Sequence, residues 1–481
     1  MIEKTKESMD KYVKALEEEL LASLEREQRL SEEELSIGAF VVGKVRKSKF
    51  YKKILSDPDS GVGKMTRAPR SIYRLIKNPE VRRGLMQKKT VNGEKIEEMN
   101  ETCFLDPWMV DLKNRKEIAE YALKNGKKLA LYFVEKPDSS TFRYRCYNTF
   151  EATKGSKKWQ AVYFLKNELD AIEGLLSRCS ELIFGRQSGQ EKTVEKLSRM
   201  AHDKGIKVGL DIDDLVFDVK YLDIMLNTIG EKTNRSYWVA YFASVQAMAK
   251  QMDFFITTNE FLAEKVKKSF NRPVKIIRNS LNQGQINASL VYTERKKLKR
   301  ENGFIIGYFS GSPTHAKDFA VVELELIRFL KKHDDAILNV VGYMKFSKEA
   351  ERLVDSGRIK FLPLTDFRKL QRLMAEVDVN IAPLVINDFT NCKSELKFFE
   401  AAVVETTTIA SPTYCFKKAI IDGKNGFLAE SGEWYDKLEF LYNHSEENRR
   451  IALAAKKYAL KHYYGKEFME EVEEAYDYFA K

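Results

Sequence analysis

Short runs of apolar and aromatic residues alternate with helix-like stretches from about residue 126 onward, and this alternation occurs twice. The first series predicts strands at 128–134, 161–164, 182–186, 207–211, 254–258 and 274–278. After a charged link at 295–301, the second series predicts strands at 304–309, 337–341, 359–362, 379–383 and 407–410. Strands that alternate with helices are typical of parallel sheets covered by helices. The sequence therefore predicts an α/β protein of two Rossmann-like, doubly wound domains facing a cleft, where ligands of such folds bind.

The length of 481 residues exceeds one ordinary domain, and the pattern divides it into four parts. We expect a mainly helical, basic extension at 1–125, the two Rossmann-like domains at 126–300 and 301–465, and a helix at 466–481 that packs back towards the first domain. The start of the extension carries apolar residues at helical spacing, which predicts an amphipathic helix over 1–30.

The charge is distributed unevenly along this extension, and the segment 41–90 alone exceeds the net charge of +11 of the whole chain. Residues 1–40 carry a net charge of −5, whereas residues 41–90 carry +12. The basic segment 41–90 is either a solvated extension or a surface for an anionic membrane, to which each Lys or Arg contributes roughly 1 kcal/mol. Nucleic acid is not expected as a partner, because the segment lacks interleaved aromatic residues and any recognisable reading motif.

The sequence also bears on the compartment. It has no apolar run of about eighteen residues, so we expect no transmembrane helix, and its start lacks the apolar core of a signal peptide. The five cysteines are scattered, which suits a reducing compartment better than a disulfide framework or a zinc site. We expect a cytoplasmic protein that can lie peripherally on the inner face of the cell membrane.

The first candidate binding site follows the predicted strand at 304–309. Its residues are small, hydroxylic or cationic: Gly311, Ser312, Thr314, His315 and Lys317. A strand that opens through small residues into a helix N-terminus lets backbone amides approach a phosphate. The alternative is a purely structural turn.

The second candidate site lies at Asn391, Lys393, Ser394, Lys397 and Glu400. Ser394 is the predicted N-cap of a helix, and Lys393, Lys397 and Glu400 are spaced to share one face of it. Cations at a helix N-terminus oppose the macrodipole, whereas an anion bound between them would reverse the sign. The alternative is an ordinary Lys–Glu pair on a solvated face.

Charged residues also follow two strands of the first series. Asp211, Asp213 and Asp214 close the strand at 207–211, where paired acids can hold a divalent metal, act as a base or position a substrate. We favour a structural or substrate-positioning role, without metal. Arg143 and Arg145 follow the first strand and can either clamp an anionic or sugar-bearing acceptor or pair with these aspartates.

At these residues the chain resembles the nucleotide-sugar glycosyltransferases of the GT-B fold, nearest to the retaining family 4 group that includes bacterial polysaccharide rhamnosyltransferases. The resemblance covers roughly 126–470. Residues 400–411, Glu-Ala-Ala-Val-Val-Glu-Thr-Thr-Thr-Ile-Ala-Ser, are similar to the family's Glu-Ala-x-Ala-x-Gly-x-Pro-Val-x-Ala-Ser, and 422–428 resemble its later glycine turn. The chain departs from the family at Cys392, where a glutamate is frequent, at Glu405 and Thr407, which replace glycine and proline, and at the loop 137–141, which is not glycine-rich.

The resemblance implies a metal-independent hexosyltransferase that needs no cofactor and uses a nucleotide-diphosphate sugar as its donor. It implies a catalytic set of Lys317, Glu400 and Asp213, in which Glu400 holds ribose or donor-sugar hydroxyls and Lys317 neutralises the diphosphate. The implied donor-binding residues are Gly311, Ser312, Thr314, His315, Lys317, Asn391, Lys393, Ser394, Lys397 and Glu400. The implied acceptor side, in the domain at 126–300, consists of Arg143, Arg145, Asp211, Asp213 and Asp214.

The expected function is transfer of a sugar to a growing, lipid-linked cell-surface polysaccharide. Two alternatives keep the fold. One is a sugar-nucleotide epimerase, and the other is a catalytically degenerate relative that serves as an assembly partner.

Overall fold

The protein was analysed as a computed structural model, which describes residues 90–91, 94–95, 110, 112–135, 137, 140–186, 191–229, 234–298, 303–310, 316–342, 344 and 346–481. The chain divides into two units, 1–106 and 107–481. In the first unit the described residues form only the antiparallel pair β1 (Thr90–Val91) and β2 (Glu94–Lys95). The predicted amphipathic helix and the basic segment 41–90, apart from residue 90, lie outside the described residues.

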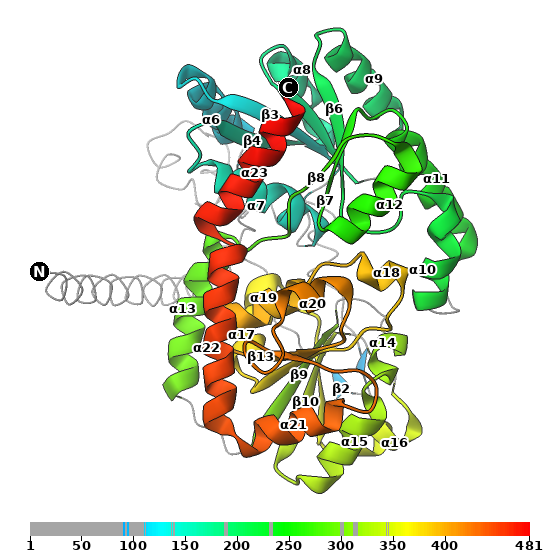
Figure 1. The fold of residues 1–481 in the computed structure, drawn as a ribbon, viewed down its shortest axis with the longest axis vertical. Coiled ribbons are helices and arrows are strands. Elements are labelled where there is room, and N and C mark those ends of the chain that lie inside the picture. Colours follow the sequence, from blue (N-terminus) through cyan, green and yellow to red (C-terminus); the bar gives the residue numbers. More distant parts are fainter. Residues whose placement is uncertain are drawn as a thin grey trace, which may run out of the picture. The chain divides into compact units, whose positions relative to one another are not determined.

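The second unit begins with a lobe built on a six-stranded parallel sheet (Figure 1). The strands lie side by side in the order β4-β3-β5-β6-β7-β8. In sequence they are β3 (Lys128–Val134), β4 (Trp159–Leu165), β5 (Glu181–Gly185), β6 (Lys207–Ile212), β7 (Phe254–Thr257) and β8 (Val274–Ile276). Strands β3 to β7 are almost entirely buried, as expected of a parallel sheet covered on both faces, whereas the edge strand β8 is partly exposed. Its helical elements are α6 (Leu112–Lys124), the π-helix η1 (Arg143–Tyr147), α7 (Asn148–Thr153), η2 (Lys166–Glu168), α8 (Leu169–Leu176), α9 (Glu191–His202), η3 (Val219–Tyr221), α10 (Leu222–Ile229), α11 (Arg235–Ala249), α12 (Glu260–Phe270) and α23 (Gly465–Phe479).

A second lobe repeats this construction with the strand order β11-β10-β9-β12-β13-β14. The strands are β9 (Phe304–Ser310), β10 (Ala336–Gly342), β11 (Ile359–Leu362), β12 (Val379–Ala382), β13 (Thr407–Ala410) and β14 (Phe427–Leu428), all paired in parallel. Its helices are α13 (Gln283–Leu298), α14 (Ala316–Ala320), α15 (Glu323–Lys332), α16 (Lys348–Asp355), α17 (Phe367–Ala375), α18 (Asp388–Asn391), α19 (Leu396–Val403), α20 (Tyr414–Ala419), α21 (Trp434–Asn443) and α22 (Ser445–His462).

The predicted fold class, two doubly wound α/β lobes of the GT-B kind, is confirmed by these two sheets. All eleven predicted strands are present, with ends that differ by at most two residues. In the two six-stranded sheets only the two-residue strand β14 was not predicted, and the short pair β1 and β2 was not predicted either. None of the described helices combines the length and the apolar composition needed to cross a bilayer.

The free edge of β4 is covered by side chains from α6, α7 and η2. Arg115 of α6 donates to the carbonyl of Tyr163 and makes two hydrogen bonds of 2.9 and 2.7 Å to Glu168. Thr153 of α7 accepts from the backbone N–H of Ala161 at 3.0 Å. An exposed strand edge is a template for unwanted pairing, and these contacts occupy it, so α6 is an integral part of the first lobe.

The chain passes between the lobes twice. It leaves the first lobe after β8 and returns to it at the junction of α22 and α23. Helix α22 packs on α19 and β13 of the second lobe, and α23 packs on α7 and β8 of the first. The two crossing segments meet where the backbone N–H of Leu281 donates to the carbonyl of Tyr463 at 2.8 Å. On the first lobe, Tyr476 of α23 shares a 2.8 Å hydrogen bond with Tyr132.

Candidate functional site

Helix α19 of the second lobe carries the centre of the candidate site, and it begins later than predicted. Its N-cap is Glu395, so the prediction of Ser394 as the N-cap is wrong. Ser394 instead accepts a 2.7 Å hydrogen bond from the side chain of Asn279 in the segment that joins the lobes. Lys393 consequently lies before the helix, and Lys397 is its second residue rather than its third.

Lys397 places a positive charge in a buried position without a partner. The residue as a whole is partly exposed, but its Nζ is buried and no described residue accepts a hydrogen bond from it. The ring of Tyr308 on β9 lies 5.1 Å from this Nζ. Burial lowers the pKa of Lys397 to about 8, although Asp318 and Glu400 act in the opposite direction. A buried, unpaired ammonium costs free energy, and a bound anion would relieve that cost.

Glu400, one turn further along α19, joins the two lobes through one of its oxygens. Oε1 accepts from Tyr144 of η1, from Arg143 Nη2 at 3.2 Å and from Gln285 Nε2 of α13 at 3.2 Å. The residue is only 6% exposed. No described residue donates to Oε2, which is nevertheless not buried. One carboxylate oxygen is thus fixed by the protein, and the other remains available to a hydroxyl group.

The acidic residues at the end of β6 are engaged in buried ion pairs. Asp211 forms a bidentate pair with Arg145, through Nε–Oδ1 at 2.8 Å and Nη2–Oδ2 at 3.1 Å. Of the two roles left open for the arginines, Arg145 takes the pairing role, whereas Arg143 pairs across the lobes with Glu400. Burial raises the pKa of Asp211 to about 6 against the opposing effect of Arg145.

Asp213 and Asp214 have different partners. Asp213 Oδ1 accepts from Arg186 Nε at 2.8 Å and its Oδ2 accepts from Thr141 at 3.1 Å. Burial opposes the ionisation of Asp213, but the charge of Arg186 outweighs it, and the pKa lies below its ordinary value. Asp214 meets Lys393 of the second lobe at 3.4 Å, which brings a predicted acceptor-side residue and a predicted donor-side residue into contact.

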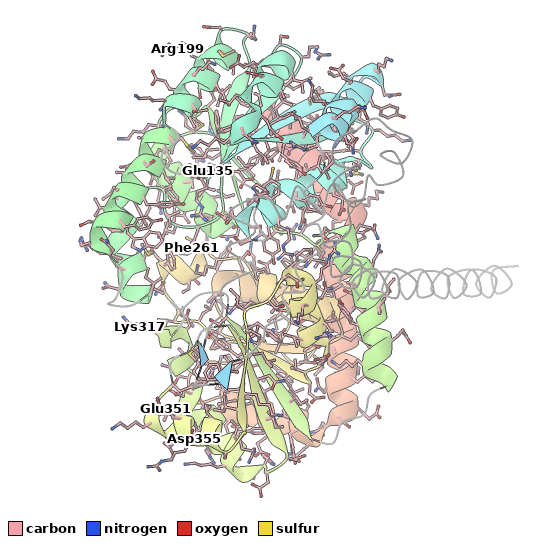
Figure 2. The ribbon with its side chains drawn as sticks, turned by 180° about the vertical axis from the view of Figure 1, so that it is seen from behind. Glu135, Arg199, Phe261, Lys317, Glu351 and Asp355 are labelled. Carbon is pink, nitrogen blue, oxygen red and sulfur yellow. The ribbon has the colours of Figure 1, made fainter. Side chains whose placement is uncertain are left out.

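The remaining predicted residues are less closely associated with α19. Lys317 is exposed at the margin of the molecule, where its Nζ donates to the carbonyl of Asn227 at 2.6 Å (Figure 2). Asn391 accepts from the backbone N–H of Tyr414 at 2.9 Å. Among the described residues, no hydrogen bond or ion pair joins Lys317 to Glu400. Gly311, Ser312, Thr314 and His315 lie outside the described residues, and α14 behind them has only five residues.

Sequence reasoning missed Tyr144, Gln285 and Tyr308. Tyr144 stood between the two arginines that were singled out, so its position there was a usable signal. Gln285 and Tyr308 had no such signal, because their roles arise from helix α13 and strand β9 meeting α19 in space. Among the described residues, no group of three or more His, Cys, Asp or Glu side chains is placed to hold a metal ion, and the prediction of a metal-independent reaction remains a prediction.

Residues 303–444, which span β9 to α21, match the family model described as "Glycosyl transferases group 1". The second lobe is similar to a glycosyltransferase group 1 domain over these residues. The resemblance drawn from the motifs at 400–411 and 422–428 is confirmed to that extent, and the rhamnosyltransferase branch remains a prediction. No curated protein matches the sequence.

The structure was also compared with solved structures, of which three are similar over about three quarters of this chain. HepE from Anabaena, in complex with UDP and glucose, has a TM-score of 0.49 at 13% identity over 73% of this chain and 100% of that one. Sucrose-phosphate synthase from Thermosynechococcus elongatus gives 0.49 at 10% identity over 73% and 99%. A glycosyltransferase from Rickettsia africae gives 0.48 at 14% identity over 74% and 99%.

Within the matched region, the family's glycine position is occupied by Glu405. Glu405 has a φ of 58°, the left-handed region that favours glycine. Its side chain pairs with Lys456 at 2.9 Å and its carbonyl accepts from Lys296 Nζ at 2.9 Å. These two lysines hold the backbone turn that glycine otherwise adopts without strain.

Proposed function

We propose that the chain transfers a sugar from a nucleotide-diphosphate sugar to a growing, lipid-linked cell-surface polysaccharide. The observation that carries the donor assignment is the buried Nζ of Lys397, which has no hydrogen-bond partner among the described residues. A diphosphate beside it would supply the missing acceptor at the start of α19, where the helix dipole also favours an anion.

The chemistry of sugar transfer makes use of this charge. As the bond between the sugar and the diphosphate breaks, negative charge increases on the leaving group. A fixed cation stabilises that charge more in the transition state than in the ground state, which lowers the barrier. In this proposal Lys397 is the principal cation, Lys393 and Lys317 act as outer cations, and Glu400 accepts a ribose or sugar hydroxyl through Oε2.

The acceptor side is proposed at the end of β6. Asp213 is held by Arg186 and Thr141 in its ionised form, so it is ready to accept a hydrogen bond from an acceptor hydroxyl. Asp211 and Arg145 are already engaged in their mutual buried pair and are proposed to position this edge of the sheet.

The proposal is tested with the purified full-length chain in two steps. A thermal-shift screen with UDP-, GDP- and dTDP-sugars identifies the donor, because ligand at one hundred times its dissociation constant stabilises the protein by about 2.7 kcal/mol. Nucleotide release is then measured with and without a glycan acceptor. Release that depends on the acceptor supports transfer, whereas isomerisation of the sugar without release would replace transfer with epimerisation.

One observation favours a second candidate, the non-catalytic assembly partner. Cys392 occupies the position where the family often has a glutamate, and it is fully buried in the core of the first lobe. Burial raises the pKa of this thiol well above its ordinary value, so it cannot replace a carboxylate. Donor binding in the screen without release or isomerisation would establish this candidate.

The lipid-linked acceptor gives the basic segment 41–90 a proposed role. With a net charge of +12, it would hold the enzyme against an anionic membrane surface. Deleting 1–90 should abolish sedimentation with anionic liposomes and leave turnover of a soluble acceptor unchanged. Sedimentation that persists after the deletion would rule out this role.

A further inference from the structure

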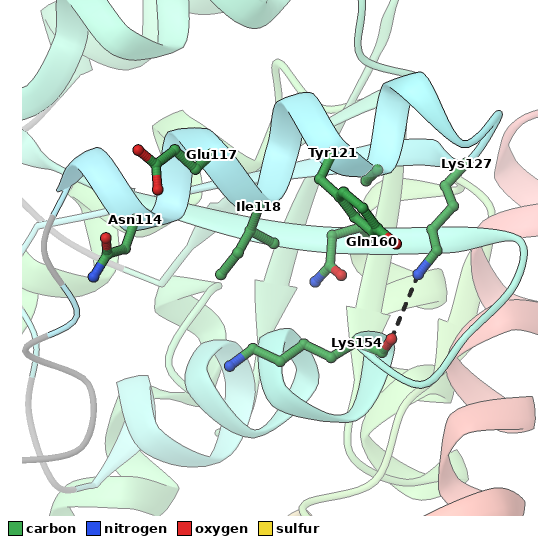
Figure 3. A pocket seen from close by; sticks show the side chains of 8 residues that line it. Asn114, Glu117, Ile118, Tyr121, Lys127, Lys154 and Gln160 are labelled. Carbon is green, nitrogen blue, oxygen red and sulfur yellow. Dashed lines mark hydrogen bonds between the residues drawn. The ribbon is translucent and has the colours of Figure 1, made fainter.

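A cavity of about 490 Å³ lies in the first lobe between α6 and the end of α7 (Figure 3). Its lining includes Asn114, Glu117, Ile118 and Tyr121 of α6, Lys154 after α7, and Gln160 of the edge strand β4. It shares no residue with the site around α19. The volume falls in the range of roughly 300–1,000 Å³ that is usual for small-molecule sites.

Gln160 gives the cavity a fixed acceptor. The residue is 2% exposed, and its Nε2 donates to the carbonyls of Phe150 and Ala161 and to Oγ1 of Thr153, at 2.9 to 3.2 Å. These three acceptors determine the orientation of the amide. No described residue donates to Oε1, and this oxygen is not buried. A buried glutamine is thereby held with a free carbonyl oxygen towards the cavity.

The walls combine apolar faces with hydrogen-bonding groups. Tyr121 is 67% exposed and lies beside Gln160 (Figure 3). Ile118 lies on the other side of Gln160, and the side chain of Lys154 lies across the opening. Glu117, which pairs with Lys113 at 3.7 Å, supplies a carboxylate at the rim, and Lys127 adds a second ammonium. Such a lining offers donors and acceptors around an aromatic ring and an aliphatic side chain.

A sugar ring matches this lining. It presents apolar C–H groups on its faces and hydroxyl groups, which both donate and accept, around its rim. The lining carries both signs of charge, because Lys127 and Lys154 lie in it together with Glu117. A multiply charged phosphate would meet the carboxylate of Glu117 and the carbonyl oxygen of Gln160 as well as the two lysines, whereas uncharged sugar hydroxyls can donate to the first two groups and accept from the lysines. A purely apolar ligand would leave these polar groups without water or partners.

We propose that this cavity binds one or two rings of a saccharide at a site separate from the donor site. The inference rests on the proposed function only for the origin of the saccharide. In that function it would be an inner part of the glycan acceptor, distant from the end to which the new sugar is added. A second attachment point raises the effective concentration of a long acceptor without a new contact at the reacting end.

The test measures saccharide binding without donor, so its outcome is independent of whether the chain transfers sugar. Saturation-transfer NMR is recorded on the full-length chain with maltohexaose, cellopentaose and a trigalacturonate, and with inorganic phosphate as a competitor. We expect at least one saccharide to bind, Tyr121→Ala to weaken it at least tenfold, and phosphate not to displace it. Tyr478→Ala removes another exposed tyrosine, 48% exposed on α23, and should leave binding unchanged.

Three results would overturn the proposal. They are no binding by any of these saccharides, binding that Tyr121→Ala leaves intact, and displacement by phosphate. Glu117→Gln serves as a second variant, because it changes one exposed rim group and should reduce affinity without affecting folding.

Discussion

The buried ammonium of Lys397 leads to a prediction that separates a ligand site from a structural lysine. Replacing it in Lys397→Met keeps a similar side-chain length but removes the charge. If the lysine is structural, its loss should destabilise the ligand-free protein. If it serves to bind an anion, its loss should reduce stability only when the anion is present. We therefore expect Lys397→Met to be more stable than the wild type without ligand and to lose the stabilisation that a nucleotide sugar provides.

The magnitude follows from the lowered pKa of Lys397, which falls from its ordinary 10.5 to about 8. At about 1.4 kcal/mol for each pKa unit, the charged form costs the folded protein roughly 3 kcal/mol at pH 7. Between pH 8 and 10.5 the folded protein releases this proton before the unfolded chain does, so the wild type gains stability as the pH rises. The advantage of Lys397→Met should therefore be largest at neutral pH and should disappear as the pH approaches 10.5.

Thermal unfolding at pH 7 and pH 9.5, with and without the donor found in the screen, measures these effects. A gain of roughly 3 kcal/mol corresponds to about 6–12 °C for a lobe of 150–250 residues. Lys393→Met is the matched control, because Lys393 already pairs with Asp214 at the partly exposed lobe boundary and its loss should cost at most about 1 kcal/mol. If Lys397→Met is less stable than the wild type and still responds to the donor, the anion-site argument is wrong.

Three further predictions concern glutamates. Glu400→Gln should lower stability by about 3 kcal/mol because it leaves the buried charge of Arg143 without its carboxylate, and the double variant with Arg143→Met should recover part of this loss in thermal unfolding; fully additive losses would contradict the coupling. Glu405→Gly should be about 1 kcal/mol more stable than Glu405→Ala, because both lose the pair with Lys456 but only glycine adopts a φ of 58° without strain; equal melting temperatures would argue against that strain. Glu181 is fully buried with neither carboxyl oxygen bonded to a described residue, and burial raises its pKa well above 4.5. The unfolded chain then releases this proton first, so the unfolding free energy of the wild type should fall as the pH rises above about 4.5. Unfolding free energies of Glu181→Gln, measured by chemical denaturation at several pH values, should fall less steeply with pH than those of the wild type.

The fold was predictable because most strands are apolar runs that are buried on both faces, and such runs can be read from local sequence. The strand at 128–134 illustrates this, since its six last residues are all buried and its predicted bounds are those of β3. Helix α6 shows the limit of the approach. It was assigned to the predicted extension 1–125 because the alternation of strands and helices was expected to begin at about 126, but Arg115 points inward to close the edge of β4.

The candidate site was predictable in composition but not in its pairing. The sequence marked Arg143 and Glu400 independently, yet their ion pair joins residues 257 positions apart and no local pattern contains it. Ser394 has a strong intrinsic preference for an N-cap, but its hydroxyl accepts a hydrogen bond from Asn279 and the helix begins one residue later. Both differences arise from the meeting of the two lobes, which is a property of the tertiary structure.

The position of α23 has a consequence for the order in which the protein folds during synthesis. Tyr132, Trp159 and Phe254 of the first lobe pack against Tyr476 and Phe479, whose helix follows the end of β8 by about 190 residues. At roughly 5–20 residues per second, the ribosome needs about 10–40 s to produce that stretch. During this interval the aromatic face of a nearly finished sheet stays uncovered, so the nascent first lobe is a natural client for a chaperone until the last helix emerges.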